Sequence, residues 1–301
     1  MDSERQKQAL NQGNERVELS IVVPAYNEEQ AIGPVLASIR ETMDSAGFVY
    51  EVVVVDDGSK DDTAAAAESA GVRVLRHTEN RGYGAALKTG IRHAAFSLIA
   101  ITDADGTYPN ERLPDLARLA VEGSYDMVVG ARTGVSVKIP LVRRPAKWAL
   151  TRLANRLARM TIPDLNSGLR VFRKEVYNEM VRYLPSGFSF TTTLTLAMLS
   201  NDYVVHYVPI SYHVRVGSSK IRPVKDTLNM LGLILRTVMY FAPLRVLLPI
   251  SGMLLLAAIA VLVGSALFTP KIMDVTVIVI TMTALQIAVV ALVADLIEKR
   301  H

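Results

Sequence analysis

Cysteine is absent from the 301 residues of the chain, and aromatic residues make up only 6% of it, with a single tryptophan. The absence of cysteine excludes a disulfide scaffold, a thiolate metal site and a cysteine nucleophile. Disorder throughout the chain is also excluded, because half of the residues are hydrophobic. The mean hydropathy of +0.26 is high for a purely soluble enzyme, but a charged fraction of 21% is too large for a bundle of membrane helices. We therefore expect a polar globular part joined to a concentrated apolar part.

The apolar part lies near the C-terminus, where Val246–Phe268 has no charge and Val275–Ile297 has only Asp295. As a helix with a rise of ~1.5 Å per residue, each stretch is roughly 34 Å long and can cross a hydrocarbon core of about 30 Å. The alternative is a pair of helices buried in a soluble core, but neither stretch has the polar stripe that such helices usually carry. We predict a transmembrane hairpin over residues 246–297.

Charge around this hairpin predicts its orientation. The cations outside it are Arg236, Arg245, Lys299 and Arg300, whereas the connecting loop has only Lys271. The positive-inside rule then places both termini and the globular part in the cytoplasm. Residues 1–18 are polar and lack the apolar segment of a signal peptide, so we expect a disordered tail there.

Short β-branched runs alternate with helical stretches from Leu19 to about Val129. The expected strands are Leu19–Val23, Glu51–Val55, Val72–Arg76, Leu98–Thr102 and Asp126–Val129. The expected helices are Glu29–Met43, Asp62–Ala70, Tyr83–Ala95 and Glu111–Val121. This alternation predicts an α/β fold with a mainly parallel sheet covered by helices on both faces. Ligands of such sheets bind beyond the carboxyl ends of the strands.

Acidic residues follow three of the expected strands, in the segments Asn27-Glu28, Asp56-Asp57-Gly58-Ser59 and Asp103-Ala104-Asp105-Gly106. Each segment alone has a structural explanation, since Asp and Ser cap helices and Asp-Gly forms turns. Together they indicate a cation site, because two carboxylates one residue apart offer oxygen ligands to a divalent ion that also binds phosphates and water. His77 and His93 are isolated in the sequence, and we expect both to be structural or surface residues.

Three motifs resemble the nucleotide-sugar site of inverting glycosyltransferases with the GT-A fold: Val23-Pro24-Ala25-Tyr26-Asn27-Glu28, Val55-Asp56-Asp57-Gly58-Ser59 and Asp103-Ala104-Asp105. More narrowly, the chain resembles polyprenyl-phosphate glycosyltransferases, the group of dolichyl-phosphate mannose synthase and bacterial undecaprenyl-phosphate glucosyltransferases. The narrower resemblance rests on the hairpin and on residues 80–86, 130–132, 166–170 and 215–220. It implies a GT-A catalytic domain over residues 19–220 that transfers a hexose from UDP-hexose or GDP-mannose to a polyprenyl or dolichyl phosphate.

The resemblance also implies roles for individual residues. The base and ribose of the donor would lie between Pro24, Tyr26 and Glu28 on one side and Val55 and Asp57 on the other. Asp103 and Ala104 would continue the nucleotide site, and Asp105 would bind the diphosphate through Mg²⁺ or Mn²⁺. Phosphates of donor and acceptor would contact Arg132, Arg215 and Lys220. The expected catalytic residues are therefore Asp103, Asp105 and Arg132.

Two departures from the mannose synthase pattern weaken a specific assignment of mannosyl transfer. Thr107 stands where that family has glutamine, which leaves the second metal ligand open, and the segment from Arg215 to Lys220 is one residue shorter.

Relatives that glycosylate sugar hydroxyls have an acidic pair late in the domain, but Gly187–Thr193 here contains no acid, and Asp202 is expected to lie in a turn. A phosphate acceptor explains the difference, because its oxygen is already ionised and needs no general base. Two alternatives stay open, a membrane glycosyltransferase that acts on a lipid or glycan hydroxyl and a non-catalytic nucleotide-binding scaffold. The retained Asp103 and Asp105 argue against the scaffold.

A long basic segment, Met127–Pro163, has no acidic residue and many cations. Within it, residues 143–160 place leucines on one helical face and arginines on another, which predicts an amphipathic helix on an anionic membrane surface. Nucleic-acid binding is the competing interpretation, and the hairpin, which already requires a membrane, argues against it. Residues 221–245 are expected to form a second interfacial helix. We also expect a homo-oligomer, since two spans are too few to enclose a lipid path.

Overall fold

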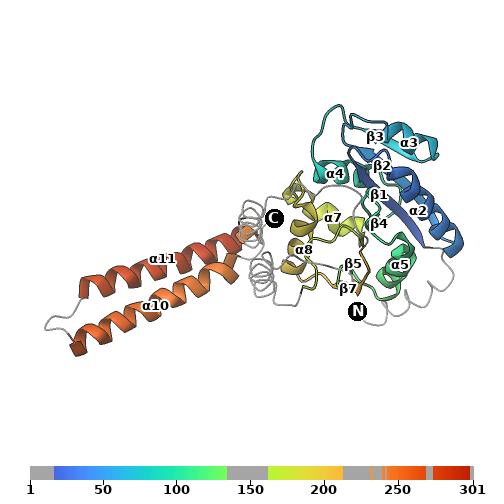
Figure 1. Ribbon diagram of the computed structural model, residues 1–301. Coiled ribbons are helices and arrows are strands. Elements are labelled where there is room, and N and C mark those ends of the chain that lie inside the picture. The colour runs from blue at the N-terminus through green and yellow to red at the C-terminus, as the bar shows by residue number, and fades with distance from the viewer. Residues whose placement is uncertain are drawn as a thin grey trace.

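The computed structural model describes residues 17–133, 162–212, 232, 239–240, 243–268 and 274–298. These residues form an α/β domain and a separate helical hairpin (Figure 1). The domain contains a seven-stranded sheet in the order β3-β2-β1-β4-β6-β5-β7. Its strands are β1 (Glu18–Ala25), β2 (Val49–Asp56), β3 (Arg73–Arg76), β4 (Leu98–Ile101), β5 (Met127–Ala131), β6 (Arg170–Arg173) and β7 (Val205–Pro209).

The sheet is mainly parallel, as the alternation of strands and helices predicts. Strand β6 is the exception in the described sheet, because it pairs antiparallel with both β4 and β5. The first five strands lie where β-branched runs predict them, within two residues at each end. The sequence patterns did not predict β6 or β7. The expectation of an α/β fold with a mainly parallel sheet is confirmed.

Helices cover both faces of this sheet. One face packs against α2 (Ile32–Ala46) and α5 (Leu113–Glu122), which follows the 3₁₀ turn η1 (Asn110–Arg112). The other face packs against α4 (Tyr83–His93), α7 (Lys174–Met180) and α8 (Phe190–Ser200). The short α3 (Thr63–Ser69) lies beside β2 and β3 at the edge of the sheet. Two buried apolar clusters result, one on each face, and they hold the carboxyl ends of β1, β2 and β4 side by side.

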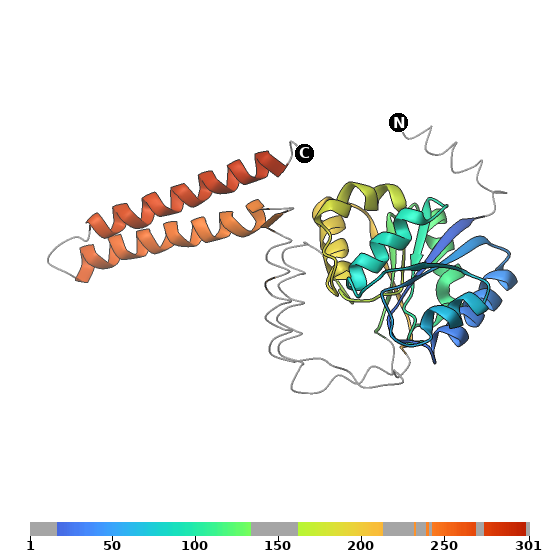
Figure 2. The same cartoon turned by 90° about the horizontal axis from the view of Figure 1, so that it is seen from above.

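The hairpin consists of α10 (Pro243–Phe268) and α11 (Asp274–Glu298), and both are long and apolar enough to cross a membrane. Figures 1 and 2 show it projecting away from the domain on the side of α7 and α8. Small buried residues at Ala258, Ala284 and Ala291 let the two backbones approach each other. Ser251 Oγ on α10 donates a hydrogen bond to the carbonyl oxygen of Ala284 on α11, at 2.8 Å. Most other hairpin side chains are exposed, which disfavours the alternative of two buried core helices.

The root of the hairpin contacts the domain on one face of the sheet. Val246 packs against the apolar cluster beneath α4, α7 and α8. Nearby, the ring of Tyr240 lies 4.4 Å from that of Tyr183, which belongs to the 3₁₀ turn η3 (Val181–Tyr183). The predicted interfacial helix over residues 143–160 lies outside the described residues, as does most of the one predicted over residues 221–245.

Candidate active site

The loops that follow β1 and β2 are joined by hydrogen bonds at the carboxyl edge of the sheet. Asn27 adopts a left-handed backbone conformation, with φ of 54°. Its N–H donates to Ser59 Oγ at 2.9 Å, and its side-chain oxygen accepts a bond from the N–H of Lys60 at 2.9 Å. The N–H of Glu28 donates to Thr63 Oγ1 at 2.8 Å. These bonds fix the polypeptide around two residues expected at the donor site, Glu28, which is half-buried, and its neighbour Tyr26, whose ring is exposed (40%).

Asp57 is almost fully buried and holds the loop that begins α4. Its carboxylate accepts hydrogen bonds from the backbone N–H groups of Arg81 (3.0 Å) and Gly82 (2.8 Å). The imidazole of His77 contacts the same carboxylate at 2.6 Å through Nδ1, and Thr89 at 2.9 Å through Nε2. Thus Asp57 and His77 have structural partners within the protein, as expected for His77. Gly82 has φ of +100°, a conformation that favours glycine.

Asp103 lies at the end of β4, half-buried between tyrosine and glycine residues. Its Oδ1 accepts a hydrogen bond from the hydroxyl of Tyr83 at 2.8 Å. The backbone of Gly168 approaches so closely that a Cβ there would lie 3.0 Å from both carboxylate oxygens. Burial and the adjacent Asp103 raise the pKa of Tyr83 well above its ordinary value, so this hydroxyl remains a hydrogen-bond donor. Asp103 is therefore oriented from two sides.

Asp105, two residues later, borders an acidic cleft of about 620 Å³. Its Oδ1 accepts hydrogen bonds from both the N–H (3.1 Å) and the hydroxyl (2.6 Å) of Thr107. Thr107, which departs from the mannose synthase pattern, is fully buried and orients Asp105. The other acidic residues at the cleft are Glu28, Glu29, Asp61 and Glu111. The cleft thus brings together two expected site residues from different loops, Glu28 and Asp105.

Three other expected donor-site residues, Pro24, Val55 and Ala104, are buried. Val55 and Ala104 belong to the apolar clusters on opposite faces of the sheet, and none of the three lines the cleft at Asp105.

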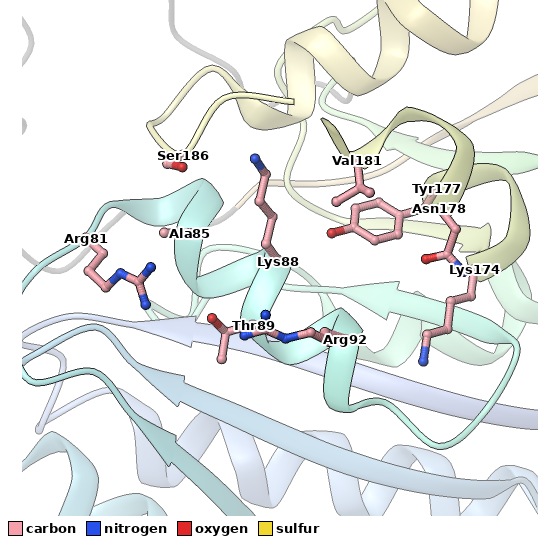
Figure 3. A pocket seen from close by; sticks show the side chains of 10 residues that line it. All are labelled: Arg81, Ala85, Lys88, Thr89, Arg92, Lys174, Tyr177, Asn178, Val181 and Ser186. Carbon is pink, nitrogen blue, oxygen red and sulfur yellow. The ribbon is translucent and has the colours of Figure 1, made fainter. Parts of the chain in front are cut away.

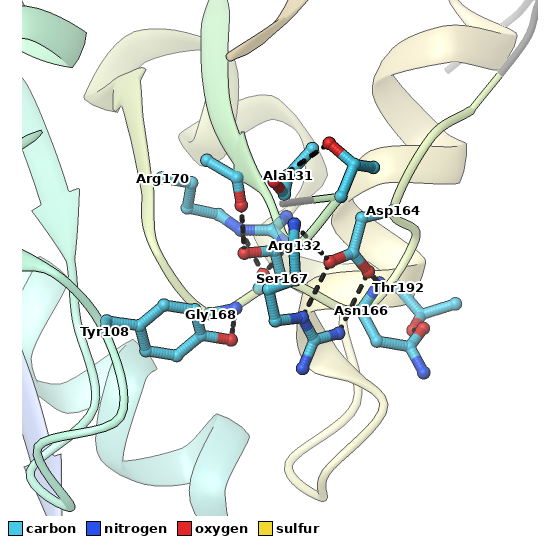
Figure 4. A network of polar contacts seen from close by, with 11 residues as sticks. Tyr108, Ala131, Arg132, Asp164, Asn166, Ser167, Gly168, Arg170 and Thr192 are labelled. Atoms are coloured by element: carbon cyan, nitrogen blue, oxygen red, sulfur yellow. Dashed lines mark hydrogen bonds and ion pairs between the residues drawn. The ribbon is translucent and has the colours of Figure 1, made fainter. Parts of the chain in front are cut away.

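Arg132 follows β5 and forms a two-pronged ion pair with Asp164 (Figure 4). Its Nε donates to Asp164 Oδ2 at 2.7 Å and its Nη2 donates to Oδ1 at 2.9 Å. The guanidinium also lies 5.3 Å from the centre of the Tyr212 ring. Burial alone would raise the pKa of Asp164, but the hydrogen bonds and charge of Arg132 outweigh it and hold that pKa below its ordinary value. The sequence singled out Arg132 but not Asp164.

Arg170 is a fully buried cation beside this pair that the sequence did not mark as functional. It donates hydrogen bonds to the carbonyl oxygens of Ser167 and Thr191 and to Thr195 Oγ1. Burial lowers the pKa of its guanidinium. It ties the loop that contains Gly168, next to Asp103, to helix α8 (Figure 4). The only sequence signal for this role is the position of Arg170 at the end of the Asn166–Arg170 motif.

The first turn of α8 contains no acid that could serve as a general base. Thr191, Thr192 and Thr193 are buried there. Asp202 lies in a turn with φ of 60°, as predicted, and its exposed carboxylate is 4.0 Å from Arg245 at the root of the hairpin. Arg215 and Lys220, the other expected phosphate-binding residues, lie outside the described residues.

The chemistry of the strand edge suits a hard divalent cation. Asp103 and Asp105 lie in the loop after β4 and are both half-buried. Within the described ranges there is no group of three or more His, Cys, Asp or Glu side chains that would enclose a metal ion. A site with one or two carboxylates fits Mg²⁺ or Mn²⁺, which commonly complete their coordination with substrate phosphates and water.

Comparison with known proteins identifies relatives of the chain. Residues 20–181 match the model of glycosyl transferase family 2. A dolichyl-phosphate hexose transferase of Haloferax volcanii is 37% identical over 207 residues, which span 68% of this chain and 87% of the relative. An undecaprenyl-phosphate 4-deoxy-4-formamido-L-arabinose transferase of Shewanella sediminis is 32% identical over 245 residues, which span 78% of this chain and 70% of the relative.

Solved structures show the same fold at lower identity. Mannosyl-3-phosphoglycerate synthase of Rubrobacter xylanophilus matches with a TM-score of 0.60 and 20% identity, over 81% of this chain and 77% of that protein. A second match is glucosyl-3-phosphoglycerate synthase of Mycobacterium tuberculosis, in complex with Mn²⁺, UDP and phosphoglyceric acid. Its TM-score is 0.59 at 22% identity, over 78% of this chain and 81% of that protein. The family match covers more than half of the chain, which therefore belongs to family 2 of the glycosyltransferases and is a glycosyltransferase with a GT-A-like fold.

Proposed function

We propose that the protein transfers a hexose from a nucleotide diphosphate sugar to a polyprenyl or dolichyl phosphate at the cytoplasmic face of a membrane, with inversion at the anomeric carbon. One observation carries the proposal: the carboxylates of Asp103 and Asp105 lie at the ligand-binding edge of a glycosyltransferase sheet, in a chain that ends in two apolar helices. The relatives from Haloferax volcanii and Shewanella sediminis, named for transfer to dolichyl and undecaprenyl phosphates, support the same acceptor class.

In this proposal the donor nucleotide binds along the loops after β1, β2 and β4. The exposed ring of Tyr26 stacks on the base, while Pro24 and Val55 shape the floor. Glu28, Asp103 and Ala104 lie beside the ribose and the diphosphate of the donor. Asp57 acts by holding the loop at Arg81 and Gly82 in place beside the nucleotide.

Asp105, with Asp103 beside it, would hold the Mg²⁺ or Mn²⁺ ion. The bound ion would neutralise negative charge on the departing nucleoside diphosphate. Thr107 keeps the Asp105 carboxylate oriented through two hydrogen bonds. Tyr83 and Gly168 do the same for Asp103.

The acceptor phosphate needs cations rather than a base. Arg132 has five N–H donors, of which two bind Asp164, so the remaining ones can bind a phosphate oxygen. Arg215 and Lys220 would complete this phosphate site. Because a phosphate oxygen is already ionised near neutral pH, attack on the anomeric carbon requires no proton transfer to the protein. The acid-free start of α8 agrees with this mechanism.

Membrane attachment follows from the hairpin. We propose that α10 and α11 span the bilayer, that residues 143–160 and 221–245 lie in the cytoplasmic interface, and that the domain of residues 19–220 faces the cytoplasm. The cations on the outer sides of the hairpin support this orientation. A homo-oligomer would supply the further membrane helices needed to enclose a lipid path.

The decisive experiment is a donor panel with the purified full-length protein. UDP-glucose, UDP-GlcNAc and GDP-mannose are each incubated with a short-chain polyprenyl phosphate, and the product anomer is determined by NMR. We expect transfer from one donor, inversion, abolition by EDTA and recovery with Mg²⁺ or Mn²⁺. Asp105→Asn should lower the rate at least a hundredfold, because charge on the leaving group is no longer offset.

Asp115→Asn is the matched control, since Asp115 is a half-exposed carboxylate on α5 that pairs with Arg112. Its rate should equal that of the unaltered protein. Transfer to the corresponding polyprenol but not to its phosphate would contradict the proposal and favour the hydroxyl-acceptor alternative.

A further inference from the structure

A basic groove lies between α4 and α7, and one end of it is at Arg81, in the loop that Asp57 holds. It has a volume of about 490 Å³ and is lined on the α4 side by Arg81, Ala85, Lys88, Thr89 and Arg92, and beyond it by Lys174, Tyr177, Asn178, Val181 and Ser186 (Figure 3). Every charged residue of this lining is a cation: Arg81, Lys88, Arg92 and Lys174. The acidic cleft at Asp105 shares none of these residues.

Local structure explains why the cations converge. Ala85, Lys88 and Arg92 are three or four residues apart on α4 and therefore share one helical face. Lys174, the first residue of α7, approaches from the opposite wall of the groove (Figure 3). The buried Tyr177 forms part of the same wall.

Within the part of the chain that the structure describes, the cations of the groove have no carboxylate partner. Among the described residues, no ion pair involves Arg81, Lys88, Arg92 or Lys174. The ammonium of Lys88 donates to the carbonyl oxygen of Leu184, and that of Lys174 donates to the carbonyl oxygen of Ala94 at 2.7 Å. An ammonium group has three protons, so both lysines retain donors for a ligand.

The concentrated positive charge of the groove favours binding of an anion. Four like charges around one cavity repel each other, and a bound anion would remove that repulsion. Lys88 is half-buried, and burial lowers the pKa of its ammonium. Arginine and lysine donors arranged around a cavity match a phosphate group, which accepts several hydrogen bonds and binds guanidinium in two-pronged fashion.

The groove also lies on the face of the sheet that bears the hairpin root. Val181, in its lining, begins the turn η3, and Tyr183 of that turn contacts Tyr240 just before α10. The apolar cluster beneath α4 and α7 includes the contact with Val246 of α10. Groups at the surface of a membrane crossed by α10 would therefore lie on the same side of the protein as the groove.

We propose that the groove between α4 and α7 is a second anion site that binds a phosphate group, carried either by the headgroup of an anionic lipid or by a small molecule in solution. The groove shares no lining residue with the acidic cleft at Asp105, and the proposal does not depend on the transferase mechanism. Binding there would anchor the domain by a charge contact in addition to the hairpin.

Calorimetric titration of the full-length protein in detergent with EDTA tests the site. The probes are dihexanoyl phosphatidic acid, dihexanoyl phosphatidylcholine, inorganic phosphate and pyrophosphate. We expect at least one phosphate probe with net negative charge to bind and the phosphatidylcholine not to bind. Lys88→Gln with Arg92→Gln should weaken binding roughly tenfold, equivalent to about 1.4 kcal/mol. The single change Arg92→Gln should also weaken binding, and it should not disturb the fold because the side chain is exposed.

A charge-matched double variant, Arg76→Gln with Arg118→Gln, lies on β3 and α5 and should bind normally. Asp105→Asn should also bind normally, because it alters only the donor site. Binding of phosphatidic acid alone would assign the site to a lipid headgroup, and binding of inorganic phosphate or pyrophosphate would assign it to phosphate groups in general. Absence of binding, or equal weakening by the charge-matched variant, would overturn the proposal.

Discussion

Arg132 and Asp164 show how one ion pair positions a residue that the motif pattern assigns to phosphate binding. Asp164 takes two of the five guanidinium donors of Arg132 and also accepts a bond from its backbone N–H at 3.0 Å. The Arg132 side chain is 25% exposed and that of Asp164 only 7%. Most of the rotational freedom of the arginine is thus removed before a ligand arrives, which lowers the entropic cost of binding.

Replacement of Asp164 by asparagine tests the strength of this pair. At neutral pH we expect Asp164→Asn to lower the free energy of unfolding by about 3 kcal/mol, because a partly buried arginine loses its counter-ion. The pKa of Asp164 lies below 3.8 in the folded protein. The stabilisation is therefore fully present above about pH 3.8 and is lost as the pH falls through the lower, folded-state pKa. Thermal unfolding in detergent, followed by circular dichroism as a function of pH, measures the difference.

The exposed pair of Arg112 and Asp115 provides the control for this prediction. Its two side chains are 40% and 48% exposed, so Asp115→Asn should cost less than about 1 kcal/mol. The difference in free energy of unfolding between the unaltered protein and Asp164→Asn should shrink at low pH. A difference that stays constant down to pH 2 would contradict the assigned role of the carboxylate.

Site residues could be predicted from the sequence where the residues that act together are close to each other in the chain. Asp103 and Asp105 are two residues apart after a β-branched run, so their proximity follows from the strand alone. The bond of Asp57 to the backbone of Arg81 and Gly82 spans more than twenty residues, and the pair of Arg132 and Asp164 spans 32. Partners at such separations depend on how the strands are ordered in the sheet, which the local pattern does not determine.

At the scale of elements, α4 fixes one side of the site through its close packing on β1 and β2. Gly90 allows this approach, since a Cβ there would lie 2.4 Å from a methyl group of Val22 and 3.0 Å from one of Val55. Both neighbours are fully buried and cannot move freely. We expect Gly90→Ala to destabilise the protein by about 1–3 kcal/mol through overpacking, measured as a lower unfolding midpoint in denaturant.

Gly33 on α2 is the matched control, because no atom lies within 4 Å of a Cβ built there. Gly33→Ala should leave stability unchanged or raise it by up to about 1 kcal/mol, since alanine favours the helix. Equal effects of the two substitutions would show that α4 does not pack tightly on the sheet in solution.

Elements with a clear pattern could be predicted, and those without one could not. The strands β1, β2 and β4 are β-branched runs buried on both faces. Strand β6 begins and ends with arginine, one of them fully buried, so its sequence does not look like a core strand. Helix α8 is buried along its whole length and has no polar stripe that would reveal a helical period. The predicted helix at Glu111–Val121 begins instead with the 3₁₀ turn η1.

On the scale of the whole molecule, opposite charges are segregated although the formal net charge is only +4. Acidic side chains surround the cleft at Asp105, and cations line the groove beside α4 on the face that carries the hairpin root. This distribution, together with the cations outside the hairpin, supports the proposed orientation in the membrane. Small residues between α10 and α11 let the two helices pack closely, so we expect them to cross the membrane as a pair.

The natural absence of cysteine makes that orientation directly measurable. Single cysteines are introduced at Lys271 between the two spans, at Lys299 after the second span, and at the exposed Ser45 on α2. With a membrane-impermeant maleimide on intact cells, we expect Lys271→Cys to be labelled and Lys299→Cys and Ser45→Cys to be labelled only after permeabilisation, because the positive-inside rule keeps the flanking cations in the cytoplasm. The unaltered chain reports background labelling directly. Labelling of Ser45→Cys on intact cells would place the catalytic domain outside, where nucleotide sugars made in the cytoplasm cannot reach Asp105.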